Sequence, residues 1–398
     1  MKKSTIEQLV STSILFAISS ITILPFLFKT TPVLVDDEKD FKMLLHNLTS
    51  NVEFHSENNI LPALLFLPLS FNAEVSDFLI SDQISINYSH LTFLRLVPAI
   101  LSSLVAPFFF NFLYYQGTSL RTAFILSLFF PLDSSFIIRS RLFLPDCFIY
   151  FFSVVSLFFF SAAIKYNSFS CYMISAFSSS ISFLCDHQGL YIVSYIFFRL
   201  VDLSLKQKMK FHPFFLYVLY LFANLIICFC FIAIIHIGLQ SGPSDIQPLY
   251  TRFASETADM ISLNSDIGIS FDSNFSLISK FSFPKVTNDI KIIPNFMMFL
   301  IFLTGIFASI RYKKPNSISH FFLAFFSSFF YKDTLINHMQ IMIIFGLISA
   351  APFFDITIKN QSQLVSYIIM FVSLITYLFS FQSIYGGRLS FQVLDHEL

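Results

Sequence analysis

The sequence predicts an all-α polytopic membrane protein with about eleven transmembrane helices. Of its 398 residues, 55% are hydrophobic and only 12% are charged, whereas soluble domains carry about 25% charged residues. The hydrocarbon core of a bilayer is about 30 Å thick and requires roughly 20 apolar residues for each helix that crosses it. Apolar runs near that length recur along the whole chain. Composition and run length together therefore favour a multi-pass membrane class.

The apolar runs define the expected helices in chain order. They are residues 9–28, 91–114, 120–138, 142–163, 169–185, 188–201, 211–236, 292–310, 318–331, 338–356 and 364–383. The two shortest, 188–201 and 318–331, are short enough to be re-entrant. A further run at 60–72 is too short to span and favours a helix that lies in the membrane interface.

Basic residues in the short connections predict the orientation, because Lys and Arg are retained on the cytoplasmic side. Lys2 and Lys3 open the chain and place the N-terminus in the cytoplasm. Eleven crossings put the other basic connections on that side: Arg121, Lys165, Lys206, Lys208, Lys210, Arg311, Lys313, Lys314 and Lys359. The C-terminus is then expected in the lumen. Asn-x-Ser/Thr sequences for N-glycosylation lie on the luminal side at Asn47, Asn87 and Asn274, which favours the endoplasmic reticulum membrane.

This topology divides the chain into three parts. Residues 1–236 are expected to form an N-terminal membrane bundle, which contains the first luminal loop at 29–90. Residues 237–291 form a second luminal loop, and residues 292–398 form a C-terminal membrane bundle. No basic stripe indicates a nucleic-acid partner.

Charged residues gather at the predicted luminal ends of the helices. They include an acidic triplet, Asp36, Asp37 and Glu38, directly after the first apolar run. The others are Arg95, Asp133, Arg139, Arg141, Asp146, Asp186, His187, Asp245 and His338. Charges at the membrane boundary are costly and mark substrate paths, and carboxylates mixed with arginines suit a site that handles a phosphate. A solvated loop is the alternative for the triplet, and snorkelling or helix capping is the alternative for each single arginine.

Several short motifs occur in the order typical of one glycosyltransferase family. The longest is LDSSFIIRSRLFLPD at 132–146, which has an LD pair, an S-R pair and a second Asp. The other segments are VDDE at 35–38, LRLVPAI at 94–100, CDHQGLY at 185–191, SGPSD at 241–245, NHM at 337–339 and SIYG at 383–386. Together they resemble the protein O-mannosyltransferases, the dolichyl-phosphate-mannose–protein mannosyltransferase family, over about residues 30–386.

The resemblance implies a GT-C-type glycosyltransferase architecture and a defined reaction. Mannose would pass, with inversion, from dolichyl phosphate mannose to Ser or Thr hydroxyls of luminal proteins. Asp37 is expected to act as the catalytic base, and Glu38 to orient the acceptor or share that role. The expected substrate-binding residues are Arg95, Arg139, Arg141, Asp146, Asp245 and His338, with Arg95 and Arg141 on the donor phosphate. No metal ion and no cofactor are expected, and the expected partner is a second copy or a related mannosyltransferase.

The sequence departs from the family in three places. The first loop of the family continues into an H-P-P-L-G-K segment, where this chain reads ENNILP at 57–62. Eukaryotic members carry a β-trefoil MIR domain in the large luminal loop, but residues 240–291 are too few to hold one. The chain also lacks tryptophan, so any aromatic platform for a sugar or a lipid must be Phe or Tyr. We therefore expect a short form without the MIR domain.

Three other functions remain open on the sequence. The altered H-P-P segment is compatible with a degenerate subunit that pairs with an active mannosyltransferase. A related transferase could use another lipid-phosphate sugar or another acceptor. A transporter should show internal repeats and Gly- or Pro-broken helices in corresponding halves, and the chain has only 9 Gly.

Overall fold

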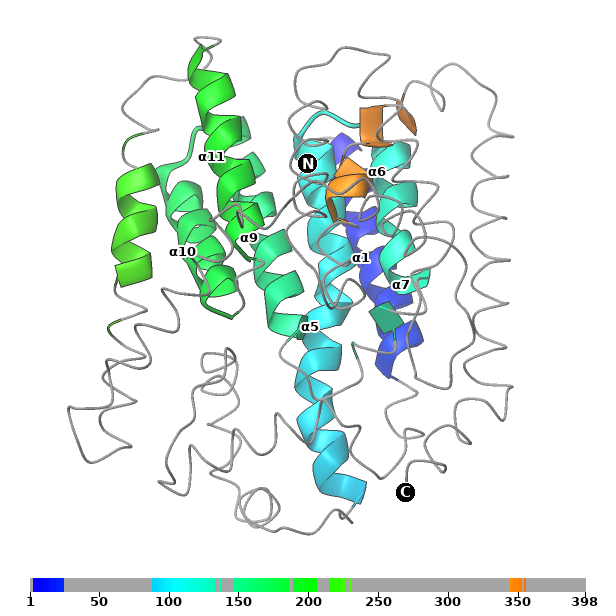
Figure 1. Cartoon of the computed structure of the whole chain (residues 1–398). Coiled ribbons are helices and arrows are strands. Elements are labelled where there is room, and N and C mark those ends of the chain that lie inside the picture. Colours follow the sequence, from blue (N-terminus) through cyan, green and yellow to red (C-terminus); the bar gives the residue numbers. More distant parts are fainter. Residues whose placement is uncertain are drawn as a thin grey trace, which may run out of the picture.

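The structure is a computed structural model, and its described part is helical. It describes residues 3–24, 88–132, 136–137, 140, 146–185, 189–205, 215, 217–226, 230, 344–348, 350–352 and 354–355. The helices of this part run up and down beside one another (Figure 1). Helix α5 is central, because it packs against α1 on one side and against α9 on the other.

Helix α1 spans Lys3–Ile23, so it begins and ends earlier than the run predicted at 9–28. The polar residues before Leu9 extend the helix, since helix propagation does not require apolar side chains. The end has a local cause. The residue before a proline is disfavoured in the α conformation, and the helix ends just before the sequence reaches Pro25.

Helix α5 spans Tyr88–Tyr115 and contains Pro98 and Pro107, each of which removes one backbone donor. The helix ends in a turn at Gly117, whose φ of 92° is a left-handed conformation that favours glycine. The Asn111 side-chain amide donates to the Pro107 carbonyl at 2.8 Å.

The run predicted as one helix at 120–138 is interrupted in the structure. Helix α6 spans Leu120–Ser127, and the short helix α7 spans Phe129–Leu132. Pro131 cannot donate to the Ser127 carbonyl, so the break falls where that bond would have formed. Asp355, far away in sequence, accepts from the Ser119 backbone N–H at 2.9 Å and caps the start of α6.

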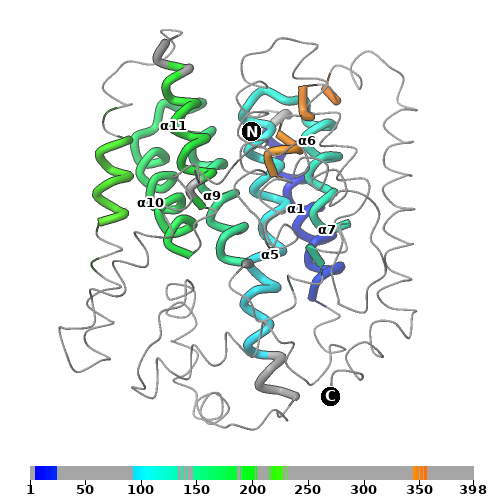
Figure 2. Tube along the Cα trace, in the orientation of Figure 1, coloured from blue at the N-terminus to red at the C-terminus, as the bar shows by residue number. Residues whose placement is uncertain are grey.

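Helices α9, Asp146–Tyr166, and α10, Phe169–Cys185, form an antiparallel hairpin. Asn167 turns the chain between them with a φ of 49°, a left-handed conformation that Asn tolerates better than most residues. Helix α11, Gly189–Leu205, packs against α10 and extends beyond the expected 188–201. Figure 2 traces these helices in chain order.

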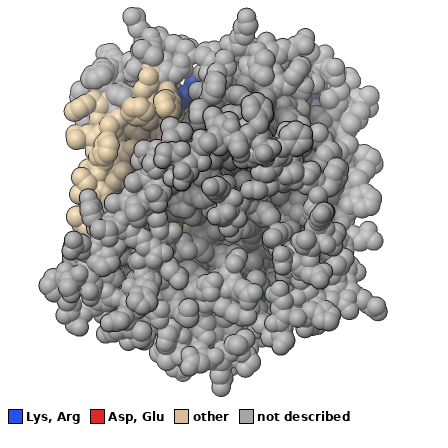
Figure 3. Space-filling model, in the orientation of Figure 1, with Lys and Arg blue, Asp and Glu red and all other residues tan. Residues whose placement is uncertain are grey.

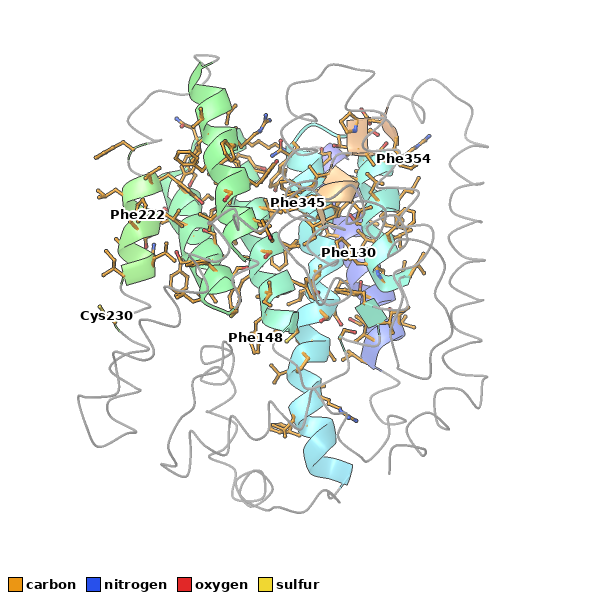
Figure 4. The ribbon with its side chains drawn as sticks, viewed as in Figure 1. Phe130, Phe148, Phe222, Cys230, Phe345 and Phe354 are labelled. Carbon is orange, nitrogen blue, oxygen red and sulfur yellow. The ribbon has the colours of Figure 1, made fainter. Side chains whose placement is uncertain are left out.

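Phenylalanines fill the space between α5 and its neighbours. The Phe109 ring meets Phe130 edge to face at 5.1 Å, and Phe110 meets Phe124 at 6.5 Å. From the C-terminal part of the chain, Phe345 packs its ring against Tyr195 of α11 at 5.6 Å. Figure 4 shows Phe345 between the α9–α11 group and the α1–α5–α6 group. The apolar composition therefore serves internal packing as well as contact with lipid.

Serines pair across the interface between α9 and α10. The Ser156 hydroxyl donates to the Ser175 carbonyl and the Ser175 hydroxyl donates to the Ser156 carbonyl, both at 2.9 Å. The Ser153 and Ser182 hydroxyls lie 2.8 Å apart, and all four side chains are buried. Small residues let membrane helices approach closely and bond across the contact.

Among the described residues, three helices are long and apolar enough to cross a membrane: Thr5–Ile23, Phe93–Tyr115 and Cys147–Tyr166. Shorter apolar helices occur at Leu120–Leu132, Phe169–Cys185, Tyr191–Val201 and Tyr217–Ile226. Helical backbone at 344–348, 350–352 and 354–355 falls inside the run predicted at 338–356. The runs at 292–310, 318–331 and 364–383 and the interfacial helix at 60–72 lie outside the described residues. The helical membrane class is confirmed, and the count of eleven stays a prediction.

The serine pairing predicts a specific sensitivity to side-chain volume. Ser175→Leu should destabilise the protein by about 1–3 kcal/mol, because it overpacks a close helix contact and removes two hydroxyl contacts to Ser156. Ser170→Leu, at an exposed position of the same helix, is the matched control. Thermal unfolding of both variants in the same detergent measures the difference, and equal unfolding temperatures would contradict the pairing.

Candidate functional site

Arg95 is a fully buried arginine inside a membrane helix. Only 1% of its side chain is exposed, and it lies within the candidate span Phe93–Tyr115 of α5. A guanidinium stays charged at every physiological pH, so burying it is costly unless other groups compensate the charge. Ionisable residues held within a membrane segment mark functional sites. Arg95 is therefore the strongest site residue in the described part of the chain.

The local sequence places Arg95 on the inward face of α5. Pro98 and Ala99 follow it at the helical spacings of three and four residues, and both are buried. Their short side chains occupy the same face as the long arginine. Leu94 beside it is also buried, at 1% exposure. The helix thus directs this cation into the protein rather than toward lipid.

The segment after α7 is anchored at Ser140. Its backbone N–H donates to the Phe136 carbonyl at 2.9 Å, and its hydroxyl donates to the Ile137 carbonyl at 2.7 Å. Phe136 in turn meets the rings of Phe130 at 5.5 Å and Tyr150 at 6.1 Å. Ser140 therefore closes a buried turn. Its neighbours in the sequence, Arg139 and Arg141, lie outside the described residues.

The starts of α5 and α9 lie toward the same end of the bundle (Figure 1). Arg95 lies two turns into α5, and Asp146 is the first residue of α9. The structure thus brings two of the predicted substrate-binding positions to one end of the bundle.

The remaining predicted site residues fall outside what the structure describes. They are Asp37, Glu38, Arg139, Arg141, Asp245 and His338, together with the side chain of Asp146. Their assignments remain predictions. Ser140 was not among the predicted site residues. The only signal for it in the sequence is its position between two arginines, and its role in closing the turn depends on the fold.

Gly189 is a second residue whose role depends on the fold and was not predicted from the sequence. A Cβ atom built at this position would overlap the backbone of Ser182 and Phe183 at the end of α10. The first residue of α11 therefore lies directly against α10. Residues 186–188, which include Asp186 and His187, lie outside the described residues.

Solved structures match this chain at low identity. An oligosaccharyltransferase from Archaeoglobus fulgidus, in complex with Zn and sulfate, matches with a TM-score of 0.57 and 14% identity over 93% of this chain and 52% of that one. Its apo form matches with a TM-score of 0.54 and 12% identity, over 94% and 55% of the two chains. The Saccharomyces cerevisiae protein O-mannosyltransferase Pmt1-Pmt2 complex bound to the sugar donor matches with a TM-score of 0.47 and 15% identity, over 65% and 35%. The chain thus spans between about a third and just over half of these proteins. No curated protein matches it significantly.

The fold is that of the GT-C-type membrane glycosyltransferases, as predicted. The family model described as dolichyl-phosphate-mannose-protein mannosyltransferase matches residues 14–239, more than half of the chain. The chain therefore belongs to this family, which confirms the resemblance seen in the motifs. The matched region contains Asp37, Glu38, Arg95 and the 132–146 segment. The segments after residue 239, which include Asp245 and His338, are outside it.

The close approach at Gly189 predicts that no side chain is tolerated there. Gly189→Ala should lower the unfolding temperature clearly, because either α11 or the end of α10 must shift to remove the overlap with backbone atoms. Ser194→Ala on the same helix, at a half-buried position, is the control. Thermal unfolding in detergent tests both variants. Wild-type stability of Gly189→Ala would show that α11 does not begin against α10.

Proposed function

We propose that this chain transfers mannose from dolichyl phosphate mannose to Ser or Thr hydroxyls of proteins at the luminal face of the endoplasmic reticulum membrane. The observation that carries the proposal is Arg95, a buried cation at one end of a membrane helix within the family-matched region. A lipid-linked sugar phosphate brings an anion to this depth of the membrane. A buried arginine is suited to receive it.

Donor binding is assigned to the arginines. Arg95 and Arg141 contact the phosphate, and Arg139 assists from the same segment. The planar guanidinium matches two phosphate oxygens at once. When the bond to mannose breaks, the negative charge on the departing phosphate increases, so the same contacts strengthen in the transition state. Ser140, buried and hydrogen-bonded, supports this assignment because it restrains the backbone between the two arginines.

Acceptor activation is assigned to the first luminal loop. Asp37 takes the proton from the attacking hydroxyl, and Glu38 orients the acceptor or shares the proton transfer. Displacement with inversion needs a single base. The dolichyl phosphate leaves as a stabilised anion and needs charge compensation more than a proton. Asp146, Asp245 and His338 are assigned to bracing the substrates around this centre.

A second candidate function is that of a degenerate subunit. The observation in its favour is the ENNILP sequence at 57–62, which replaces the H-P-P-L-G-K segment typical of the family. In that case the chain would act with a related mannosyltransferase and contribute structure rather than catalysis. In either case we propose that the working unit is a dimer, either of two copies or with a relative.

The donor site predicts a graded response at Arg95. Arg95→Gln should weaken dolichyl phosphate mannose binding by about tenfold or more, because a charged hydrogen bond contributes about 1.5–3 kcal/mol. Arg95→Lys should restore the affinity only in part, since an ammonium lacks the planar fork. Titration of the detergent-solubilised chain with the donor measures both variants.

Arg199→Gln provides the control for the loss of an arginine. Arg199 of α11 donates to Gln116 at 3.4 Å, just beyond the end of α5 that is opposite Arg95, so its loss should leave donor affinity unchanged. The unfolding temperature of each variant separates loss of binding from loss of fold. Wild-type donor affinity in a folded Arg95→Gln variant would remove Arg95 from the site.

The base assignment predicts a loss of turnover with donor binding retained. Asp37→Asn should lower the rate of mannose transfer by about 10²–10⁴-fold, the usual contribution of a positioned base. Glu38→Gln should act mainly on acceptor affinity. Asp36→Asn is the matched control, because it precedes the catalytic pair and should change little. Transfer to a Ser/Thr peptide is measured with the chain expressed alone and together with a related mannosyltransferase.

Two outcomes would change the conclusion. If Asp37→Asn transfers mannose at the wild-type rate, Asp37 is not the base. If the wild-type chain is inactive alone but raises the activity of its partner, and Asp37→Asn does so equally well, the degenerate-subunit function replaces the catalytic one.

A further inference from the structure

Three tyrosine rings surround the ammonium group of Lys165 at the end of α9. The Nζ atom lies 4.1 Å from the ring centroid of Tyr115, 4.8 Å from Tyr114 and 5.5 Å from Tyr166. Cations within about 6 Å of an aromatic ring are attracted by the negative face of the ring. These four residues, here called the Lys165 cage, are contributed by α5 and α9.

Contacts from several elements hold the cage in place. Tyr115 meets Tyr166 edge to face at 5.6 Å and stacks on Phe158 at 5.6 Å. The Gln8 side chain of α1 donates to the Tyr115 hydroxyl at 3.3 Å. The left-handed residues Gly117 and Asn167 turn the chain directly beyond Tyr115 and Tyr166. The rings are therefore positioned by packing and not by a flexible loop.

Within the described part of the chain, the cage pairs Lys165 with ring faces and with no carboxylate. Among the described residues, the interactions of Lys165 are the three ring contacts, and its side chain is exposed. An ammonium has three N–H donors, and the ring faces that hold it are poor substitutes for an oxygen acceptor. The exposed side of Lys165 is thus in a position to donate to an anion.

The depth of the cage in the membrane indicates which anion can reach it. Lys165 and Tyr166 end the candidate membrane span Cys147–Tyr166, so they lie at the boundary between hydrocarbon and headgroups. Tyrosine rings and snorkelling lysines are typical of that depth, where the phosphates of the lipids lie. In the view of Figure 3, the described part of the surface is almost entirely uncharged, with a small basic area near its upper edge.

We propose that the Lys165 cage binds the phosphate group of an anionic phospholipid in the leaflet at this end of the bundle. The rings hold the ammonium from one side, and the lipid phosphate accepts its hydrogen bonds from the other. In the predicted orientation this is the cytoplasmic leaflet, where anionic lipids are concentrated. The site is separate from the proposed donor site, because Arg95 lies toward the opposite end of α5 from Tyr115.

Lipid binding by the full chain tests the proposal. The protein is reconstituted in nanodiscs of phosphatidylcholine, with or without phosphatidylserine, and lipid retained after transfer to detergent is measured by native mass spectrometry. We expect the wild type to retain phosphatidylserine and to unfold at a higher temperature when this lipid is present. Lys165→Gln should bind it roughly fivefold more weakly, which is the effect of one basic residue at an anionic surface.

Two further variants separate a built site from diffuse surface charge. Arg121→Gln removes an exposed basic residue at the start of α6, near the same end of the bundle, and should leave retention unchanged. Tyr166→Leu should weaken retention although Lys165 remains, because it removes one wall of the cage. Tyr166 is 59% exposed, so its loss should not prevent folding.

Three results would overturn the proposal. The first is equal phosphatidylserine retention by Lys165→Gln and the wild type. The second is an equal loss in Arg121→Gln and Lys165→Gln, which would indicate unspecific charge. The third is full stabilisation of the wild type by inorganic phosphate in phosphatidylcholine nanodiscs, which would show a free anion as the ligand instead of a lipid.

Discussion

A polar group inside the hydrocarbon region must find its partners within the protein, and the structure depends on this constraint. No water is present there to satisfy an exposed donor or acceptor. Ser103 and Ser127 each donate back to a carbonyl four residues earlier, at 2.7 Å. Other polar groups bond across helices, as the Ser156–Ser175 pair does between α9 and α10. Internal hydrogen bonds therefore decide which helix faces meet in a chain that is apolar on most sides.

The same constraint makes α5 the organising element. Asn111 accepts from Gln8 at 2.6 Å and donates to Thr12 at 3.1 Å, so α1 and α5 meet in one register. At one end of α5, Arg95 carries a permanent charge into the interior. At the other, Tyr115 contacts Lys165. One long helix thus connects the end proposed to bind the sugar donor with the end proposed to bind lipid phosphate.

The motifs in the sequence were sufficient to predict the family and the fold class, and the comparisons confirm both. The helix at 169–185 has the predicted bounds, and its start follows the turn at Asn167. Predicted helix boundaries were wrong where a backbone property that hydropathy does not measure sets the end of a helix. Pro131 interrupts a run that was predicted as one helix, and polar residues at the start of α1 continue the helix that begins at Lys3. Hydropathy measures transfer into lipid and does not report where a backbone bond is missing.

The sequence by itself determined the membrane class, the family and the choice of Arg95 as a candidate site residue, because composition and motif order can be read without knowing the fold. Only the tertiary structure decided that Arg95 is buried, that Ser140 closes a turn, and that Gly189 lies against α10. Tertiary structure also gathers the rings of Tyr114, Tyr115 and Tyr166 around the ammonium group of Lys165. The contacts of the cage join residues far apart in the sequence. They depend on helix register, which is set by side-chain packing and hydrogen bonds across interfaces and is not encoded in hydrophobic run length.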